Sequence, residues 1–307
     1  MLTATGLKSG HLLVSGRNMK RSVVALIVAA VGSGAILSAP VSAVAGARPV
    51  THDDFDSATF SHGSAIDNRY LPLAPGLQLT LEGTVNAGGT PGLHRVVFTV
   101  TDLTKKIDGV RSRVIYDVDS TAGVTTEAEL AFMAQDDDGN VWNTGEYPEV
   151  FEDGVFAGAP AAWLTGSDDA HAGVGMRVRP RAGTSDYFQG LIPSIGFGDL
   201  ASIVGVLPQV CVPAGCFHNV LQIKETNVFA TGEGFQMKYY APRVGNIRID
   251  FLGGPEQETL ELVKIKRLGD EGLTKARLAA LRLDHRAYRV APDIFAGTPR
   301  AVVDDGD

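Results

Sequence analysis

The residues whose types and spacing suggest chemistry lie in one acidic turn. Oxygen donors alternate there at Asp136, Asp138 and Asn140, as they do in calcium loops. With Gly139 at the sixth position of an EF-hand loop, the first and twelfth ligand positions fall on Ala134 and Gly145, which carry no side-chain oxygen. A plain hairpin turn is therefore favoured, because Gly and Asn accept the positive φ of tight turns. A looser divalent-ion site is the alternative.

Histidines also lie close to carboxylates in two other segments. The Asp169-x-His171 pair could orient an imidazole for general-base catalysis, and residues 52–62 contain two His and three Asp that could bind a metal. Solvated loops are favoured for both, because nothing in the sequence fixes their geometry. The motifs G-x-S-x-G, H-E-x-x-H, C-x-x-C and the phosphate loop are absent from the sequence. We therefore expect no catalytic residues, no metal and no cofactor.

The only two cysteines, Cys211 and Cys216, enclose the turn Val212-Pro213-Ala214-Gly215. Pro suits the first central position of a turn and Gly accepts a positive φ. The two cysteines should then face each other on paired strands, near the spacing of a disulfide. A disulfide is predicted, with free thiols or a metal-binding pair as alternatives.

The N-terminus resembles a secretory signal peptide. Arg17, Lys20 and Arg21 precede an apolar run from Val23 to Leu37, and small-residue triplets suitable for cleavage follow between Val41 and Ala47. The apolar run is about 15 residues long, which is too short to favour a transmembrane helix. We predict a signal peptide over residues 1–47, with Met19 as an alternative start, and a protein that is secreted or in the cell envelope.

The charge of the chain argues against nucleic acid as a partner. The net charge is −8, and residues 1–47 contain four Lys and Arg and no acid, so cleavage would leave −8 − 4 = −12. Nucleic-acid binding needs a basic surface to neutralise phosphates.

Alternating apolar residues dominate the middle of the chain and predict strands. Leu77, Leu79 and Leu81 alternate with polar residues, and Ala128, Leu130 and Phe132 alternate with Glu127 and Glu129. On the strand near 110–118, Val114, Tyr116 and Val118 share one face and Arg113 and Asp117 the other. Turn signals recur every 8–15 residues, which favours a mainly β fold: a meandering antiparallel sheet or barrel-like domain. We predict a linker over 48–66 and the β domain over 67–268.

One amphipathic helix is predicted over 269–290, followed by a tail over 291–307. Its apolar side carries Leu273, Ala276, Ala280, Leu281, Ala287 and Tyr288. Lys275, Arg282 and Arg286 lie on the other side and should point outward when the helix docks on the sheet. A solvated helix face is the favoured interpretation, and attraction to an anionic envelope surface is the alternative.

Five ordered blocks of the sequence resemble a family of exported bacterial β-rich proteins of unknown function. They are IDNRYLPLAPGLQLTLEG, VTDLTKKIDGVRSRVIYD, MAQDDDGNVWNTGE, VPAGCFHNVLQIKE and MKYYAPRVGNI, within residues 66–266. The family's blocks read DNPYFPLxPG, AQDxxGNVWYFGE, VPAGTFxNVL and KYYAPGVG. Arg69, Asn143-Thr144 and Cys216 depart from that pattern. The resemblance implies a shared fold and no particular activity. Half-barrel lipid carriers of the envelope are an architectural analogy only.

Three classes of function follow from these features. The favoured class is an exported, non-catalytic binding or carrier β domain for an apolar or amphipathic small molecule or a lipid. A structural or interaction protein of the envelope comes second, and an unrecognised hydrolase third. Aromatic residues near turns are the expected ligand-binding residues, because Tyr and Trp combine an apolar body with a polar tip. They are Trp142, Trp163, Tyr187, Phe188, Tyr239 and Tyr240; core packing is the alternative for each.

Overall fold

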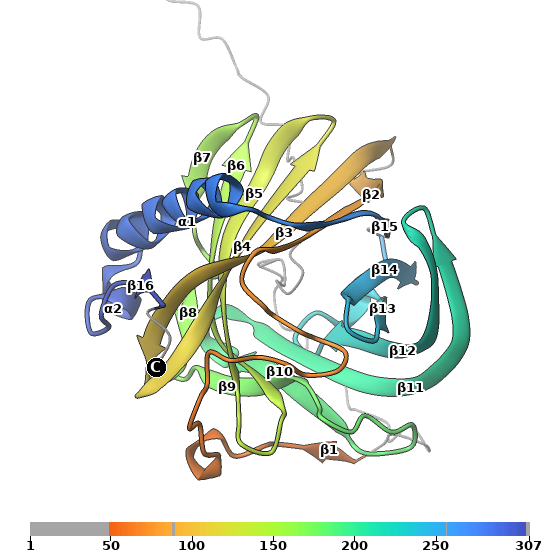
Figure 1. Ribbon diagram of the computed structural model, residues 1–307, viewed down its shortest axis with the longest axis horizontal. Helices are drawn as coiled ribbons and strands as arrows, with labels where there is room; N and C mark the ends of the chain where they lie inside the picture. The colour runs from red at the N-terminus through yellow and green to blue at the C-terminus, as the bar shows by residue number, and fades with distance from the viewer. Residues whose placement is uncertain (1–48, 88–89, 256, 305–307) are drawn as a thin grey trace, which may run out of the picture.

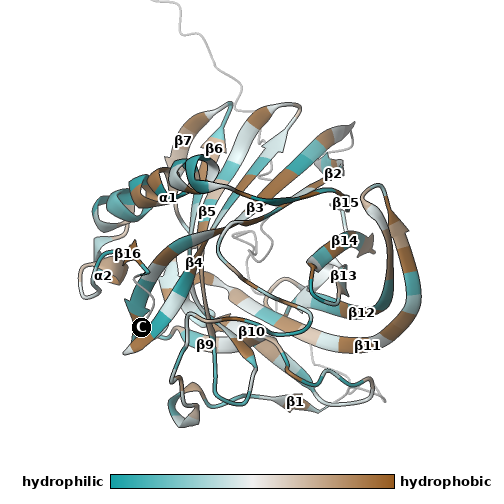
Figure 2. Ribbon diagram, in the orientation of Figure 1, coloured by the Kyte–Doolittle hydropathy of each residue, from teal (hydrophilic) through white to brown (hydrophobic). Residues whose placement is uncertain are grey.

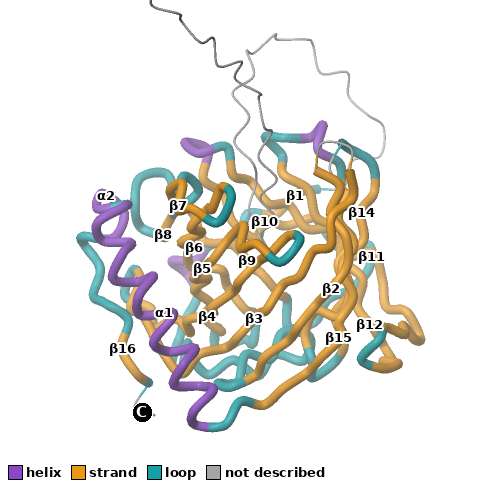
Figure 3. The backbone as a smooth tube through the Cα atoms, turned by 90° about the horizontal axis from the view of Figure 1, so that it is seen from above, coloured by secondary structure: helices purple, strands orange, loops and turns teal. Residues whose placement is uncertain are grey.

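The computed structural model describes residues 49–87, 90–255 and 257–304. The predicted signal peptide, residues 1–47, lies outside these described residues. Twelve strands form a closed antiparallel barrel, which confirms the mainly β prediction and its barrel-like form (Figures 1 and 3). In order around the barrel they are β2 (Leu77–Ala87), β3 (Thr90–Ile107), β4 (Val110–Thr121), β5 (Val124–Gln135), β6 (Val141–Glu152), β9 (His171–Met176), β10 (Asp186–Ile192), β11 (Phe197–Val212), β12 (Gly215–Asn227), β13 (Phe235–Ala241), β14 (Gly245–Leu252) and β15 (Gln257–Arg267).

Barrel neighbours follow chain order, so the topology is a meander. Tight turns join many of them: Asp108-Gly109 and Asp153-Gly154 both have positive φ at each residue, as two-residue hairpin loops require. Two contacts close the ring. β15 pairs with β2 from Gln257 to Arg267, and β9 joins β6 to β10. Each of the twelve strands thus pairs with a neighbour on both sides within the described residues.

Short elements decorate the barrel. β7 (Val155–Gly158) and β8 (Trp163–Leu164) pair with β6, β1 (Val50–Thr51) pairs in parallel with β10, and β16 (Val302–Val303) pairs with β3. Three 3-10 turns also occur, at Phe55–Ser57, Pro193–Ile195 and Thr231–Glu233. In the segment predicted as a linker, Phe55 and Phe60 contact the Trp142 ring, and Arg177 forms an ion pair with Asp53. These contacts place residues 53–60 against the barrel wall.

The predicted helix is present as α1 (Asp270–Val290) and packs on the outside of β3, β4 and β5 (Figure 1). Ala280, Leu283 and Ala287 form one buried cluster with Val114, Leu130 and Phe132 of the barrel. A short helix, α2 (Pro292–Phe295), follows and adds Phe295 to the same cluster. None of the helices in the described part of the chain is long and apolar enough to cross a membrane.

The basic side of α1 differs in part from the prediction. Lys275 and Arg282 are exposed, and Lys275 pairs with Glu271 one turn away. Arg286 does not point freely outward, because its guanidinium forms an ion pair with the buried Glu149 carboxylate and lies over the Phe156 ring. Glu149 is on β6, so Arg286 fastens the helix to the barrel. Attraction of these residues to an anionic envelope surface stays a prediction.

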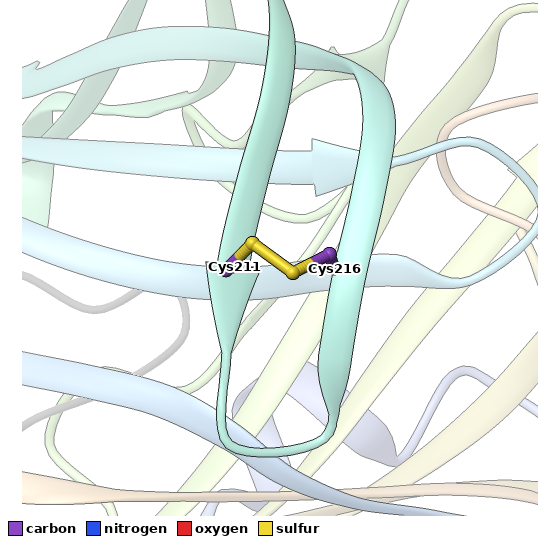
Figure 4. Close-up of a disulfide and its surroundings, with 2 residues drawn as sticks. All are labelled: Cys211 and Cys216. Atoms are coloured by element: carbon purple, nitrogen blue, oxygen red, sulfur yellow. A yellow bond between two sulfur atoms is a disulfide. The ribbon is translucent and has the colours of Figure 1, made fainter.

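The two cysteines form the predicted disulfide at the tip of the β11–β12 hairpin (Figure 4). Cys211 and Cys216 are register partners with their Cα atoms 4.0 Å apart. Both are exposed, so the bond acts by closing a short loop in the unfolded chain rather than by filling the core.

We expect replacement of both cysteines by serine to lower the free energy of unfolding by roughly 2 kcal/mol, the low end for disulfides, because the closed loop is short. Urea unfolding followed by intrinsic fluorescence measures the change. Wild-type protein unfolded with its disulfide reduced is the control, and it should match the double variant. A double variant as stable as the oxidised wild type would contradict the prediction.

Candidate functional site

The barrel interior contains two layers of different chemistry. Figure 2 shows hydrophilic and hydrophobic residues alternating along the barrel strands, so each strand presents different residues to its two faces. One part of the interior is apolar. We call this the apolar layer; its members are buried in one cluster and include Leu79, Leu81, Phe98, Ile115, Met133, Ile203, Ile223, Ile249, Leu260 and Leu262.

Further along the same strands the inward positions become charged. The step of two residues that keeps a side chain on one face leads from Ile115 to Asp117 and from Leu260 to Glu258. The residues at these positions form the acidic layer, which draws on eight strands. Its carboxyl groups are Asp117, Asp119, Glu127, Glu129, Glu146, Asp199, Glu225 and Glu258, and its cationic or basic groups are Lys238 and His94.

This arrangement changes the interpretation of strand β5. Alternation in 127–134 predicts one buried face, formed by Ala128, Leu130 and Phe132. In the structure that face does pack, but outward against α1 and α2. The polar face of the same strand, with Glu127 and Glu129, is turned inward and is buried as well. The concave side of the sheet is therefore apolar in one layer only.

Few hydrogen-bond donors serve the acidic layer. Lys238 forms an ion pair with Glu225, and Gln236 donates to Glu258 Oε2 at 3.3 Å. His94 Nε2 lies 3.3 Å from Glu258 Oε1 and 3.6 Å from Asp119 Oδ2. Among the described residues, one oxygen each of Glu127 and Glu129 has no hydrogen-bond partner. A buried, unpartnered carboxylate is costly, so these groups favour the protonated form.

Glu146 is held more firmly than its neighbours. Asn143 Nδ2 donates to one carboxyl oxygen at 2.6 Å, and Trp163 Nε1 donates to the other at 3.2 Å. These bonds favour the charged form, but burial is the larger effect and raises the pKa of Glu146 to about 8.

The other acids of the layer shift in the same direction. Burial raises the pKa of Glu258 to about 8, and the nearby Asp119 carboxylate raises it as well. Burial likewise raises the pKa of Asp199 to about 7, with the nearby Glu225 carboxylate acting in the same direction. Burial and neighbouring carboxylates hold the pKa of Asp117, Glu127 and Glu129 well above the ordinary range; burial alone raises that of Asp119. At pH 7 Glu146 and Glu258 therefore mostly carry a proton, and burial favours the protonated form of the other acids named here.

The two nitrogen bases respond in opposite ways. Burial lowers the pKa of His94, which outweighs the raising effect of Glu258. Burial also lowers the pKa of Lys238, but Glu225 and Asp199 raise it above the ordinary value. The acidic layer thus contains the Lys238–Glu225 ion pair among carboxyl groups whose neutral form burial favours.

An apolar pocket lies in the apolar layer of the interior. Its walls are Leu71, Pro72, Leu73, Leu77, Leu79, Leu81, Phe98, Met133 and Val244. Polar residues join them at Gln189, Lys238, Tyr240 and Asn246. The cavity has a volume of about 50 Å³ and lies within a concavity of about 650 Å³ that includes open solvent. Lys238 belongs to both the pocket and the acidic layer, so the pocket reaches from one layer to the other.

The six aromatic residues expected to bind a ligand are placed as follows. Tyr240 lines the apolar pocket. Trp142 contacts Phe55 and Phe60 and donates to Asp136, whereas Trp163 donates to Glu146. Tyr187 is buried under the Arg177 guanidinium, and Phe188 contacts His52. The Tyr239 hydroxyl accepts a hydrogen bond from Gln222 Nε2, and the Arg248 guanidinium lies over the Tyr239 ring. The structure thus brings one of the six, Tyr240, to the pocket wall.

The acidic turn is organised by its own hydrogen bonds. Asp136 accepts from the backbone N–H and side-chain amide of Asn140 and from Trp142 Nε1, at 2.7–3.0 Å. Across the described part of the chain, His, Cys, Asp and Glu residues form no group of three with the geometry of a metal site.

The sequence predictions do not include the acidic layer, although the spacing of its acids indicates it. Asp117 and Asp119, and then Glu127 and Glu129, repeat at a spacing of two on strands whose other face is apolar. The apolar lining of the pocket was signalled by the Leu77–Leu79–Leu81 alternation, but Gln189 and Asn246 carry no local signal.

Comparison with known proteins finds no matching family model and no matching curated relative. Two solved structures are similar over part of the chain. One is an exported-protein candidate with a YmcC-like fold from Bacteroides fragilis (16% identity, TM-score 0.35). The other is a lipoprotein candidate from Parabacteroides distasonis (11% identity, TM-score 0.35). Each comparison covers 65% of this chain and 99% of the other.

Proposed function

We propose that the protein is an exported, non-catalytic binding protein that holds a small amphipathic molecule in the apolar pocket of its barrel. The pocket with its leucine-rich wall and polar inner end carries the proposal, because ligand sites are typically apolar with a few well-placed polar groups. The disulfide supports an extracytoplasmic location, since disulfides persist in oxidising compartments.

Barrel size supports a ligand inside. The interior widens with strand number, and eight strands are already enough to hold one small ligand. Twelve strands enclose more. The cavity of about 50 Å³ admits only part of a ligand, so binding requires Leu71 and Val244, both half-buried at the pocket wall, to move aside.

Binding is favoured over catalysis because of where the carboxyl groups lie. The acids of the acidic layer are deeply or partly buried, and the pocket wall contains none of them. A molecule in the pocket meets Lys238, Gln189 and Asn246 instead.

We expect the neutral apolar dye N-phenyl-1-naphthylamine to bind with a rise in its fluorescence. A Leu71→Gln variant should bind it roughly tenfold more weakly, because a polar group replaces part of the apolar wall; a tenfold change corresponds to about 1.4 kcal/mol. Fluorescence titration gives both dissociation constants.

Leu93→Gln is the matched control, because Leu93 is also a leucine but is largely exposed. It should bind the dye as the wild type does. Organic extraction and mass spectrometry of protein from its native host complement the titration. Absence of dye binding together with an extract free of small molecules would reject the proposed function.

A further inference from the structure

Two buried amide side chains in the pocket each have one atom that finds no hydrogen-bond partner among the residues that the structure describes. They are Gln189 Oε1, on a residue 2% exposed, and Asn246 Nδ2, on a residue 4% exposed. Buried polar groups are almost always hydrogen-bonded in native proteins, and an unsatisfied one costs about 1–3 kcal/mol. These two atoms therefore indicate a ligand with matching polar groups.

The orientation of both amides follows from their other bonds. Gln189 Nε2 donates to the Gly175 carbonyl at 3.0 Å, so its oxygen must be the atom left over. Asn246 Oδ1 accepts from the Arg248 N–H at 3.1 Å, so its nitrogen must be the atom left over. The pocket therefore offers one free acceptor and one free donor.

Charge at this end of the pocket disfavours ions of either sign. A cation would meet Lys238, whose ammonium group is already paired with Glu225. An anion would give up its hydration shell in a buried pocket whose lysine is already ion-paired with Glu225, beside carboxyl groups whose neutral form burial favours. In the low dielectric of a barrel interior, a charge that gains no partner of its own is costly.

We propose that the ligand's polar end is an uncharged group that both accepts and donates hydrogen bonds, a hydroxyl or a primary amide, bound by Asn246 Nδ2 and Gln189 Oε1. This inference rests on the proposed function, because it names the ligand class of the same pocket. The apolar part of the ligand lies against the leucine wall, and the polar end points toward Lys238.

A set of molecules with one ten-carbon chain and different polar ends tests the inference. 1-Decanol, decanamide, decanoate and decylamine would each displace N-phenyl-1-naphthylamine from the full, disulfide-bonded protein at pH 7. We expect decanol or decanamide to bind at least tenfold more tightly than decanoate and decylamine. Whichever of the two neutral molecules binds better identifies the group as hydroxyl or amide.

An isosteric variant tests the residues. Asn246→Asp keeps the acceptor for the Arg248 N–H but replaces the free donor with an acceptor. We expect it to reduce the preference for decanol and decanamide over decylamine at least fivefold. Asn219→Asp, at an exposed position outside this pocket, is the matched control and should leave the preference unchanged. Thermal melts of each variant verify that it is folded.

The outcomes separate the two proposals. Failure of the dye and of all four molecules to bind would overturn the proposed function and this inference with it. Equal binding of the four would overturn the inference alone and leave the proposed function standing. A preference for decanoate or decylamine, or a preference unaffected by Asn246→Asp, would also overturn the inference.

Discussion

Raising the pH from 5 to 9 is expected to destabilise this protein by several kcal/mol. Glu146 and Glu258 have a pKa of about 8 in the folded state, against 4.5 when unfolded. Between these values the folded state keeps a proton that the unfolded state has lost. Stability therefore falls with rising pH, by up to about 1.4 kcal/mol per pH unit for each such group.

The direction of this pH dependence is unusual for carboxylates. An acid whose pKa is depressed by an ion pair stabilises the folded state at neutral pH, and this stabilisation is lost as the pH falls. Here the pKa values are raised, so the stabilisation is present at pH 4–5 and is lost as the pH rises through 8. His94 opposes the trend at the acid side, because its lowered pKa costs stability below about pH 6.5. Several acids outweigh one His, and titration of neighbouring acids is shared rather than additive.

Thermal melts from pH 5 to pH 9 measure the effect, and we expect the melting temperature to fall by roughly 10 °C or more. Glu258→Gln should flatten the slope, because a neutral amide replaces a carboxyl group that must ionise. Glu261→Gln, on the same strand but partly exposed, is the control and should keep the wild-type slope. A wild-type melting temperature that rises from pH 5 to 8 would refute the buried acidic layer.

Local patterns predict the strands and the helix but not the closure of the barrel. The alternation of Leu77, Leu79 and Leu81 and the helical period after Gly269 depend on neighbours in the chain, so sequence reveals them. Pairing of β15 with β2 joins residues about 180 positions apart, and β9 is a short strand in a glycine-rich segment. Such pairing depends on complementarity of whole surfaces, which a local window does not contain.

The same limit explains why the acidic layer was not predicted. Alternation divides a strand into two faces without stating which one is inside. Here α1, more than a hundred residues further along the chain, covers the apolar outer face of β4 and β5. Glu127 and Glu129 are turned inward as a consequence. Arg286 was assigned to a solvent-facing side for a related reason, because its partner Glu149 lies on β6.

A buried ion pair lies in the contact between α1 and the barrel, and breaking it should have a second large effect on stability. Lys105 on β3 and Asp284 on α1 are fully buried and lie 3.0 Å apart from Nζ to Oδ1. Lys105 Nζ also donates to the Tyr288 hydroxyl at 2.8 Å and to the Pro299 carbonyl at 2.7 Å. The one ammonium group thus connects a barrel strand, the helix and the C-terminal segment.

We expect Lys105→Met to lower the free energy of unfolding by about 3–5 kcal/mol, because it leaves the Asp284 carboxylate buried without its cation. The melting temperature should fall by roughly 10 °C at pH 7. Lys275→Gln is the control. It breaks the exposed Lys275–Glu271 pair on the same helix, and such i,i+4 pairs contribute only about 0.3–0.5 kcal/mol.

The double variant Lys105→Met with Asp284→Leu separates charge from packing. Replacing both members of a buried ion pair by apolar residues of similar size is often neutral or stabilising, so the double variant should regain most of the lost stability. The Tyr288 hydroxyl keeps the Thr298 carbonyl as a partner at 3.0 Å, which limits the residual cost. If the double variant were as unstable as Lys105→Met, the loss would come from the hydrogen bonds to Tyr288 and Pro299 rather than from an uncompensated charge on Asp284.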